Sequence, residues 1–337
     1  MKFITKLMLV AFLATSFLAT AQDEEEEEAG LEISGSVDTY YFGDFSGTKN
    51  RPTWFAEDQA GIGIGMIDLA LSQTVGNVSF VGEIGLGPRG AGDGDATGRA
   101  ATAAGSIQNL YVSYAASDAL SFTAGFMGTF VGYEVISPAA NFNYTASYLF
   151  SNGPFQNAGI KADYAINDKI GVMVGMFATQ WDSYSYTGID NFGAQLSISP
   201  VDGWDVYLNY ITGSQFSQWD ITTGYQLTDA FYLGANVSQN MEYGGDPDGG
   251  FFGFAGYAQY AISDGFALGL RYENFAYEFD GAPSVNSITV SGNIYAGPLT
   301  IIPEFRMDSS DQDVFFDADD AATGSFMEAG IAAVYAF

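Results

Sequence analysis

Histidine and cysteine are both missing from this 337-residue chain. Without them, Ser–His hydrolases, cysteine nucleophiles, disulfide bonds and histidine-ligated zinc or iron are all excluded. Paired carboxylates could still perform acid–base chemistry, yet the sequence pattern singles out no pair for that work. We therefore expect neither enzymatic activity nor a cofactor.

Basic residues are scarce. The chain has 10 Lys and Arg and 40 Asp and Glu, which gives a formal net charge of −30. Nucleic acids are polyanions, and a strongly acidic protein repels them. The composition therefore argues against nucleic acid as a partner.

Apolar runs long enough to span a bilayer as a helix are also missing. The longest apolar stretch, residues 7–18, follows Lys2 and Lys6 and precedes the small residues Ala19-Thr20-Ala21. This is the pattern of a secretory signal peptide, with cleavage expected before Gln22. We expect residues 1–21 to direct export of the chain.

The segment after the expected cleavage point, residues 22–30, is dominated by the acidic run "DEEEEE". A run of like charges is typically disordered, so we expect a short acidic tail here. Residues 31–337 then form the folded domain.

What the chain does contain is alternation. From Leu31 onward, apolar residues alternate with glycine, polar and charged residues, up to the terminal "GIAAVYAF" with Tyr335 and Phe337. This period of two is typical of strands with one apolar and one polar face. The stretch from Ile62 to Leu71 departs from it, since its apolar phase switches near Ile67. That switch indicates either a β-bulge or a misassigned strand.

The connections between these segments alternate in length. Seven short turns and eight long loops indicate 16 strands, and this regular alternation is typical of a transmembrane β-barrel. We therefore predict an all-β protein, a 16-stranded antiparallel barrel in the outer membrane, with both termini periplasmic. Its outward residues would contact lipid, with the terminal aromatic side chains near the periplasmic interface. The long loops are expected at about 46–58, 88–105, 127–155, 179–190, 212–217, 239–250, 274–284 and 308–324.

One stretch carries a family resemblance, which is sharpest over roughly 120–182. Within it, Gly132–Ile136 "GYEVI", Ser147–Phe150 "SYLF", Gly153–Phe155 "GPF" and Gly159–Ala162 "GIKA" resemble the putative beta-barrel porins of the OmpL-like, porin-2 type. These are outer-membrane proteins of Gram-negative bacteria. The resemblance implies a fold and a location more than a substrate.

The inward phase of the predicted strands carries charged residues. A 16-stranded barrel is wide enough for an aqueous channel, and charges are tolerated beside water. We therefore expect a wet, charged lumen; the alternative is that opposite charges simply pair and stiffen the wall. The inward candidates include Lys161, Asp163, Arg271, Glu273, Glu304 and Arg306.

The third long loop, at about Met127 to Phe155, is the longest and could fold inward to constrict or plug the bore. The alternative is that Tyr148 and Phe150 belong to an interfacial aromatic girdle and that Gly153-Pro154 is a plain turn. The constriction candidates are Tyr133, Glu134, Asn141, Asn143 and Tyr144, together with Tyr148.

These features favour a passive diffusion channel for small hydrophilic solutes or ions, with a cation preference from Glu134 and the net acidity. The rival is a non-conducting structural barrel or surface receptor, with the bore closed by the third loop. The substrate, the pore radius and the oligomeric state, which could be a homotrimer, do not follow from the sequence.

The last long loop is rich in aspartate. Oxygen ligands on a flexible backbone suit Ca²⁺. Asp308, Asp311 and Asp313 are therefore candidate Ca²⁺ ligands, with a solvated surface as the alternative, because their spacing does not match an EF-hand.

Overall fold

The computed structural model describes residues 30–91, 106–178, 188–214, 216–243 and 249–337. The expected signal peptide and the acidic tail up to residue 29 lie outside this part of the chain.

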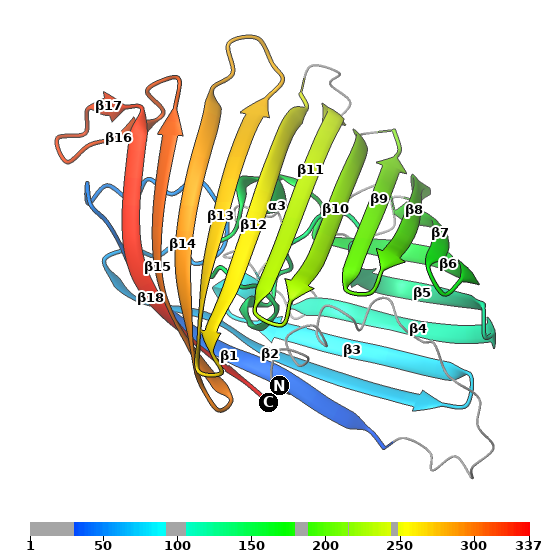
Figure 1. Cartoon of the computed structure of the whole chain (residues 1–337). Coiled ribbons are helices and arrows are strands. Elements are labelled where there is room, and N and C mark those ends of the chain that lie inside the picture. Colours follow the sequence, from blue (N-terminus) through cyan, green and yellow to red (C-terminus); the bar gives the residue numbers. More distant parts are fainter. Residues whose placement is uncertain (1–29, 92–105, 179–187, 215, 244–248) are drawn as a thin grey trace.

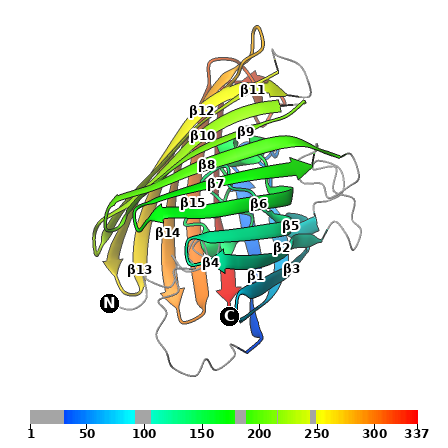
Figure 2. The same cartoon turned by 90° about the vertical axis from the view of Figure 1, so that its right-hand side faces the viewer.

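Sixteen antiparallel strands close into one barrel (Figure 1), which confirms the predicted fold class. Each strand pairs with its neighbours in the chain, and the barrel closes where β1 meets β18. Figure 2 shows β4 to β9 side by side along one part of the wall. The strands are β1 (Glu32–Asp44), β2 (Gly61–Val75), β3 (Val78–Leu86), β4 (Ile107–Ser117), β5 (Leu120–Gly128), β6 (Gln156–Asn167), β7 (Ile170–Ala178), β8 (Ile189–Val201), β9 (Trp204–Thr212), β10 (Phe216–Thr228), β11 (Phe231–Tyr243), β12 (Phe251–Ser263), β13 (Phe266–Tyr277), β14 (Ser284–Ala296), β15 (Leu299–Ser310) and β18 (Ser325–Ala336).

The connections contain a few short elements. A two-stranded sheet, β16 (Phe315–Phe316) and β17 (Ala322–Thr323), lies in the last long loop. The helix α2 (Pro88–Ala91) follows β3, and the 3₁₀ helix η2 (Pro138–Ala140) and the helix α3 (Tyr148–Asn152) lie in the third loop. Among the described residues, no helix is long and apolar enough to cross a membrane.

The outer surface of the barrel is apolar, as the alternation predicts. Ile62, Val174 and Phe192 expose 56–85% of their surface, and they alternate with inward residues along their strands. Such exposure would be costly in water but matches a lipid-facing band.

The predicted bulge near Ile67 is present on β2. Val37 pairs with Ile67 and Thr39 pairs with Ile64, so two residues of β2 lie opposite Asp38. The Met66 backbone N–H donates to Asp38 Oδ1 over 2.8 Å. The inward carboxylate thus satisfies an amide that the bulge removes from the strand ladder.

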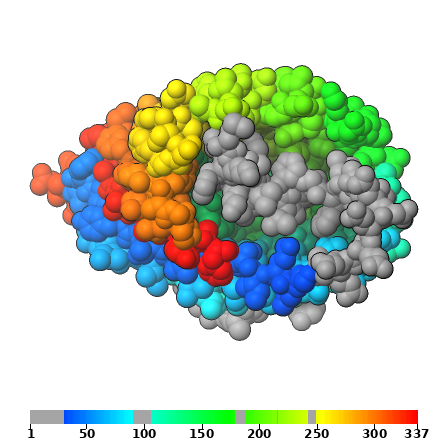
Figure 3. All heavy atoms as spheres, turned by 60° about the horizontal axis from the view of Figure 1, so that its bottom comes forward, coloured from blue at the N-terminus to red at the C-terminus, as the bar shows by residue number. Residues whose placement is uncertain are grey.

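The last residue completes the closure of the barrel. Gly35 and Phe337 exchange two backbone hydrogen bonds of 3.0 Å, and Ala336 donates to Pro298 in a short turn. The chain therefore ends at the short-turn end of the barrel, where Figure 3 shows the first strand (blue) beside the last (red). Tyr335 and Phe337 are 46% and 57% exposed on the outer side.

Candidate functional site

The third loop, residues 129–155, folds into the barrel, and Figure 1 shows its helix α3 inside the wall. Tyr148 and Phe150 are only 5% and 8% exposed. The Tyr148 ring stacks on the inward Phe275 with centroids 5.6 Å apart. The alternative that these two aromatic residues form an interfacial girdle is therefore wrong, because they lie in the interior.

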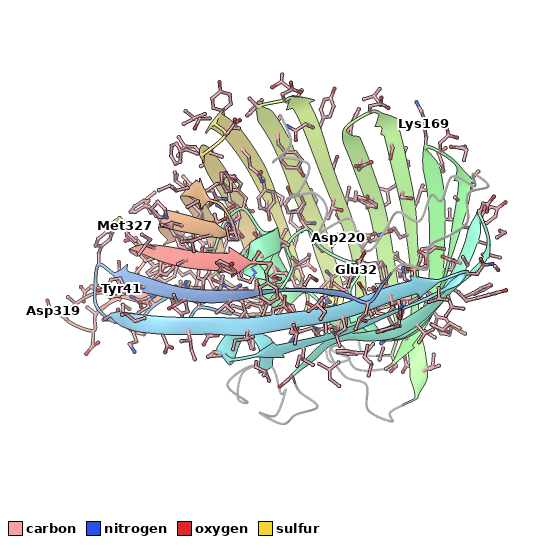
Figure 4. The ribbon with its side chains drawn as sticks, turned by 90° about the horizontal axis from the view of Figure 1, so that it is seen from below. Glu32, Tyr41, Lys169, Asp220, Asp319 and Met327 are labelled. Atoms are coloured by element: carbon pink, nitrogen blue, oxygen red, sulfur yellow. The ribbon has the colours of Figure 1, made fainter. Side chains whose placement is uncertain are left out.

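The loop begins with an anchor on β9 to β11. Asp220 of β10, which is 1% exposed, accepts the Gly132 backbone N–H at 3.0 Å. Asn209 and Asn236 donate to the two oxygens of the same carboxylate at 3.0 and 2.6 Å. Figure 4 labels Asp220 within the barrel outline. Three N–H donors thus stabilise a carboxylate in a buried position.

Tyr133 continues this anchor. Its ring stacks on Tyr257 with centroids 4.1 Å apart, and its hydroxyl donates to the Tyr232 hydroxyl over 2.9 Å. A Cβ atom at Gly234 would lie 2.3 Å from the Tyr133 oxygen, so the wall leaves room for this ring only because it carries a glycine. Burial raises the pKa of the Tyr133 phenol well above its usual range.

Arg271 of β13 is the main ionic anchor. Its guanidinium lies 2.8 Å from Glu134 Oε1 of the loop and 2.7 Å from Glu273 Oε1 of its own strand. It also donates to the Thr145 carbonyl at 2.6 Å. Glu273 in turn accepts the Tyr148 backbone N–H at 2.7 Å. The loop backbone and the wall thus share one buried charge network.

Glu304 of β15 binds the loop through neutral donors. Its two oxygens accept the backbone N–H groups of Tyr144 at 2.7 Å and Thr145 at 3.0 Å. Ser291 also donates to this carboxylate at 2.6 Å, and Asn143 donates to Ser291 at 2.6 Å. Asn143 therefore points at the wall and not at the bore.

Arg306, two residues further on, repeats the arrangement. Its Nε lies 2.9 Å from Asp308 Oδ1, and its Nη1 donates to Ala146 O at 3.1 Å and to Thr53 Oγ1 at 2.8 Å. Asp308 also accepts the Tyr148 hydroxyl at 2.7 Å. The first and third long loops therefore meet on the same arginine.

Tyr144 lies between β1 and α2. Its hydroxyl donates to Asp38 Oδ2, and the Arg89 guanidinium sits 4.7 Å above its ring. Burial raises the pKa of the Tyr144 phenol. Arg89 also donates to the backbone carbonyls of Ile136 at 3.3 Å and Tyr144 at 3.2 Å, so it holds the loop from the side of α2.

The first long loop adds a further layer. Arg51 lies 3.5 Å from Glu328 of β18, and Gln59 donates to the same carboxylate at 3.0 Å. Phe55 of this loop packs against Phe150 and Phe155 with centroids 5.7 and 5.3 Å apart. Two loops therefore fill the barrel beside β12 to β15, β18 and β1.

The inner wall of the barrel therefore has two parts, one covered by the loops and one that remains accessible. Arg271, Glu273, Glu304 and Arg306 are 0–4% exposed, so the expectation of a wet lumen is wrong for these four residues, because the loops cover them. On β6, in contrast, the side chains of Lys161 and Asp163 remain 18% and 37% exposed and pair at 3.1 Å. The accessible part of the inner wall therefore includes β6. Inward residues of β3, β8 and β9 are also partly exposed, among them Glu83, Gln195, Ser197, Asp205 and Tyr207.

The constriction candidates also fall into a buried group and a partly exposed group. Glu134, Asn143 and Tyr144 are 8%, 6% and 1% exposed and hold the loop in place. Tyr133 and Asn141 are partly exposed, and Asn141 folds back onto the loop, since its side chain donates to the Val135 carbonyl at 2.5 Å. Most of these side chains therefore act within the loop–wall contact.

The three calcium candidates differ in burial and in their partners. Asp308 is fully buried and paired with Arg306, while Asp311 is exposed and accepts the Ser284 backbone N–H at 2.8 Å. Asp313 is exposed. No group of three or more acidic residues with metal-binding geometry occurs in the described part of the chain.

The buried charged residues that the sequence reasoning missed as site residues include Arg51, Arg89, Asp68 and Asp220. The two arginines lie in loops, where charge is normally read as solvated surface. Asp220 is on the inward phase of β10, so the alternation could have identified it, whereas Asp68 lies in the stretch of β2 where the apolar phase switches.

Comparisons with known proteins agree with this architecture. Over residues 30–337 the chain matches the family described as "Putative beta-barrel porin-2, OmpL-like". A comparison with curated proteins gave no match.

Several solved structures share the fold. The outer membrane channel DcaP of Acinetobacter baumannii has a TM-score of 0.60 at 13% identity, covering 94% of this chain and 100% of that one. OprB of Pseudomonas putida has a TM-score of 0.62 at 12% identity, covering 91% and 94%. The trimer form of OmpT of Vibrio cholerae has a TM-score of 0.58 at 11% identity, covering 91% and 99%. The family match and the closed barrel together place the protein in the outer membrane, and the chain belongs to the beta-barrel porin-2, OmpL-like family.

Proposed function

We propose that this protein is a passive diffusion channel for small hydrophilic solutes, with a preference for cations. The observation that supports this proposal is that the inner wall has one part covered by the loops and another part in contact with solvent. The third loop is fixed against one part of the wall, while inward side chains of β3, β6, β8 and β9 keep contact with solvent. Solutes would pass along this accessible part.

The cation preference follows from where the basic residues are. Arg51, Arg89, Arg271 and Arg306 are 0–8% exposed and lie against the loops. Lys161 is the one basic residue on the accessible inner wall of the described chain, and Asp163 neutralises it at 3.1 Å. The partly exposed carboxylates of the wall, such as Glu83 and Asp205, would then attract cations and repel anions.

A hydrophilic cargo is supported by the chemistry of the accessible wall. Gln195, Ser197 and Asp205 present amide, hydroxyl and carboxylate groups there. Such a surface replaces water hydrogen bonds for a polar solute and offers little to an apolar one. No enzymatic step is needed for this activity, and we propose none.

The rival function is a closed barrel that acts as a structural protein or surface receptor. The observation in its favour is the extent of the third loop. Its side chains and backbone contact residues from Phe177 of β7 round to Glu304 of β15 and Asp38 of β1. A loop that reaches so far round the barrel could plug it.

Deleting residues 136–152 separates the two functions. Planar bilayer recordings on wild-type protein should give discrete conductance steps, and the deletion should enlarge them. A silent wild type that becomes conducting after the deletion would instead support the plugged barrel. Heat-dependent electrophoretic migration of both proteins provides the control that each has folded.

The setting we propose is that of an exported porin. Residues 1–21 would be removed on export, and both ends of the mature chain would lie on the periplasmic side, at the short-turn end of the barrel. A homotrimer is a further proposal, supported by the trimer form of OmpT among the similar structures. Cross-linking of the protein in native membranes tests the trimer.

A further inference from the structure

Asp68 is a buried carboxylate of the interior that takes no part in the ion pairs described above. Asp68 of β2 is 6% exposed, and its Oδ1 is buried without a hydrogen-bond partner. The Asp68 and Glu83 carboxyl groups share a side-chain hydrogen bond, and the Ser137 hydroxyl of the third loop donates to Asp68. An isolated buried charge is costly, so such a group normally has a counter-ion or several donors.

The other buried carboxylates of the described chain do have such partners. Glu273, Asp308 and Glu328 each lie within 3.5 Å of an arginine nitrogen. Asp220 receives three N–H donors. Asp68 forms no ion pair with a basic side chain of the described chain, and its partners are the Glu83 carboxyl group and the Ser137 hydroxyl.

Ser36 provides the second observation. It lies directly opposite Asp68 in the β1–β2 register, and both residues are on the inward phase of their strands. Ser36 is 1% exposed, and its Oγ also has no hydrogen-bond partner. Two buried oxygen atoms without hydrogen-bond partners therefore belong to directly paired residues on the inner face of adjacent strands.

The local charge balance is negative. Asp38, Asp68 and Glu83 contribute three carboxylates, and the Arg89 guanidinium lies 3.8 Å from Asp38 Oδ2. Asp38 is already occupied by the Met66 amide and the Tyr144 hydroxyl. The remaining pair, Asp68 and Glu83, is thus left without a cation.

We infer that Asp68, Glu83, Ser36 and Ser137 form a binding site for a hard divalent cation of the Ca²⁺ type. Carboxylate and hydroxyl oxygens are the donors that Ca²⁺ takes, and water can complete its coordination. Asp68 and Ser36 form the buried side of the site. Glu83, which is partly exposed, faces the accessible part of the lumen, so a cation can enter from the bore.

The site extends the proposed function, because a bound cation there would lie beside the proposed solute path. Ser137 precedes η2 of the third loop, so the cation would also join the loop to β1, β2 and β3. Binding itself does not depend on conduction. A failure of the site would therefore leave the channel proposal untouched, and a silent channel could still bind the cation.

Calorimetric titration of the folded barrel with CaCl₂ in detergent at pH 7.5 tests the inference. We expect one saturable site with a dissociation constant on the order of 0.1–1 mM, as for extracellular calcium modules. Asp68→Asn should abolish this binding, and Ser36→Ala should weaken it at least threefold. The Ser36→Ala change removes one hydroxyl and no charge, so it keeps the test valid if Asp68→Asn does not fold.

Two control variants test whether Ca²⁺ binds at the proposed site or at other carboxylates. Glu32→Gln removes an exposed carboxylate from the same strand as Ser36, and Asp311→Asn removes one from the aspartate-rich loop. Both variants should bind Ca²⁺ like the wild type. The inference is overturned if wild type shows no saturable binding, in which case Asp68 is neutralised by a proton, or if Asp68→Asn binds as tightly as wild type.

Discussion

Arg271 Nη1 lies 2.8 Å from Glu134 Oε1, and this ion pair joins the barrel wall to the third loop in a setting where Arg271 is fully buried. The same guanidinium also holds Glu273 and the Thr145 carbonyl. This side chain of β13 is thus one of the anchors that hold the loop against the wall, and through the loop it bears on which part of the bore stays accessible.

Replacing Arg271 with Gln should release the loop. Glu134 and Glu273 would lose the basic partner of their buried charges and keep only neutral donors, and breaking a buried ion pair typically costs about 3–5 kcal/mol. We expect a lower free energy of unfolding in urea and a larger, noisier single-channel conductance. Lys169→Gln, in an exposed turn, is the control and should change neither quantity. An unchanged conductance for Arg271→Gln would show that the loop is held by other contacts.

Gly269 tests the packing of the loop against the wall. A Cβ atom there would lie 2.1 Å from the Phe142 ring, so Gly269→Ala should displace that ring and the loop segment around it. Overpacking of this kind costs about 1–3 kcal/mol. Gly256→Ala on the neighbouring strand meets no atom within 4 Å and is the matched control. Thermal unfolding of the two variants gives the comparison, and equal melting temperatures would argue against the observed position of Phe142.

The β2 bulge should be equally sensitive. A Cβ atom at Gly65 would lie 1.8 Å from Asp38 Oδ2, in the space that this carboxylate needs to accept the Met66 amide. We expect Gly65→Ala to lower the free energy of unfolding by about 1–3 kcal/mol. Gly82→Ala, which has open space around it on β3, should have little effect. The account of the bulge is wrong if both variants unfold at the same urea concentration.

Tyr144→Phe should be destabilising although it keeps the ring. The variant removes the hydroxyl that donates to Asp38 and leaves a buried carboxylate oxygen without that donor, a loss of about 1–3 kcal/mol. Tyr164→Phe is the control, because Tyr164 is 49% exposed on the outer face. A urea titration in which the two variants coincide would remove Tyr144 from the set of loop anchors.

Much of the fold could be predicted from the sequence, because alternation and turn length are local properties. The 16 strands, the short and long connections and the switch at Ile67 all follow from patterns within a few residues. The inward phase also identifies Arg271 and Glu304 correctly as interior residues. Their surroundings could not be predicted in the same way.

The missing information is the path of the loops. Whether Glu304 meets water or the Tyr144 amide depends on where the third loop folds, and that is determined by contacts between residues about 160 positions apart. Arg51 and Arg89 show the same limit. From the sequence, an arginine in a loop is expected to contact solvent. Only the structure shows that Arg51 pairs with Glu328 and that Arg89 lies beside Asp38.

The most direct test of the central claim is the reversal potential of single channels of the purified protein in a planar bilayer with a KCl gradient. We predict discrete conductance steps and a reversal potential of the sign expected for K⁺ permeation, which falls toward zero in Asp205→Asn and not in the surface variant Glu32→Gln. Anion selectivity, or a correctly folded barrel that carries no current, would contradict the account.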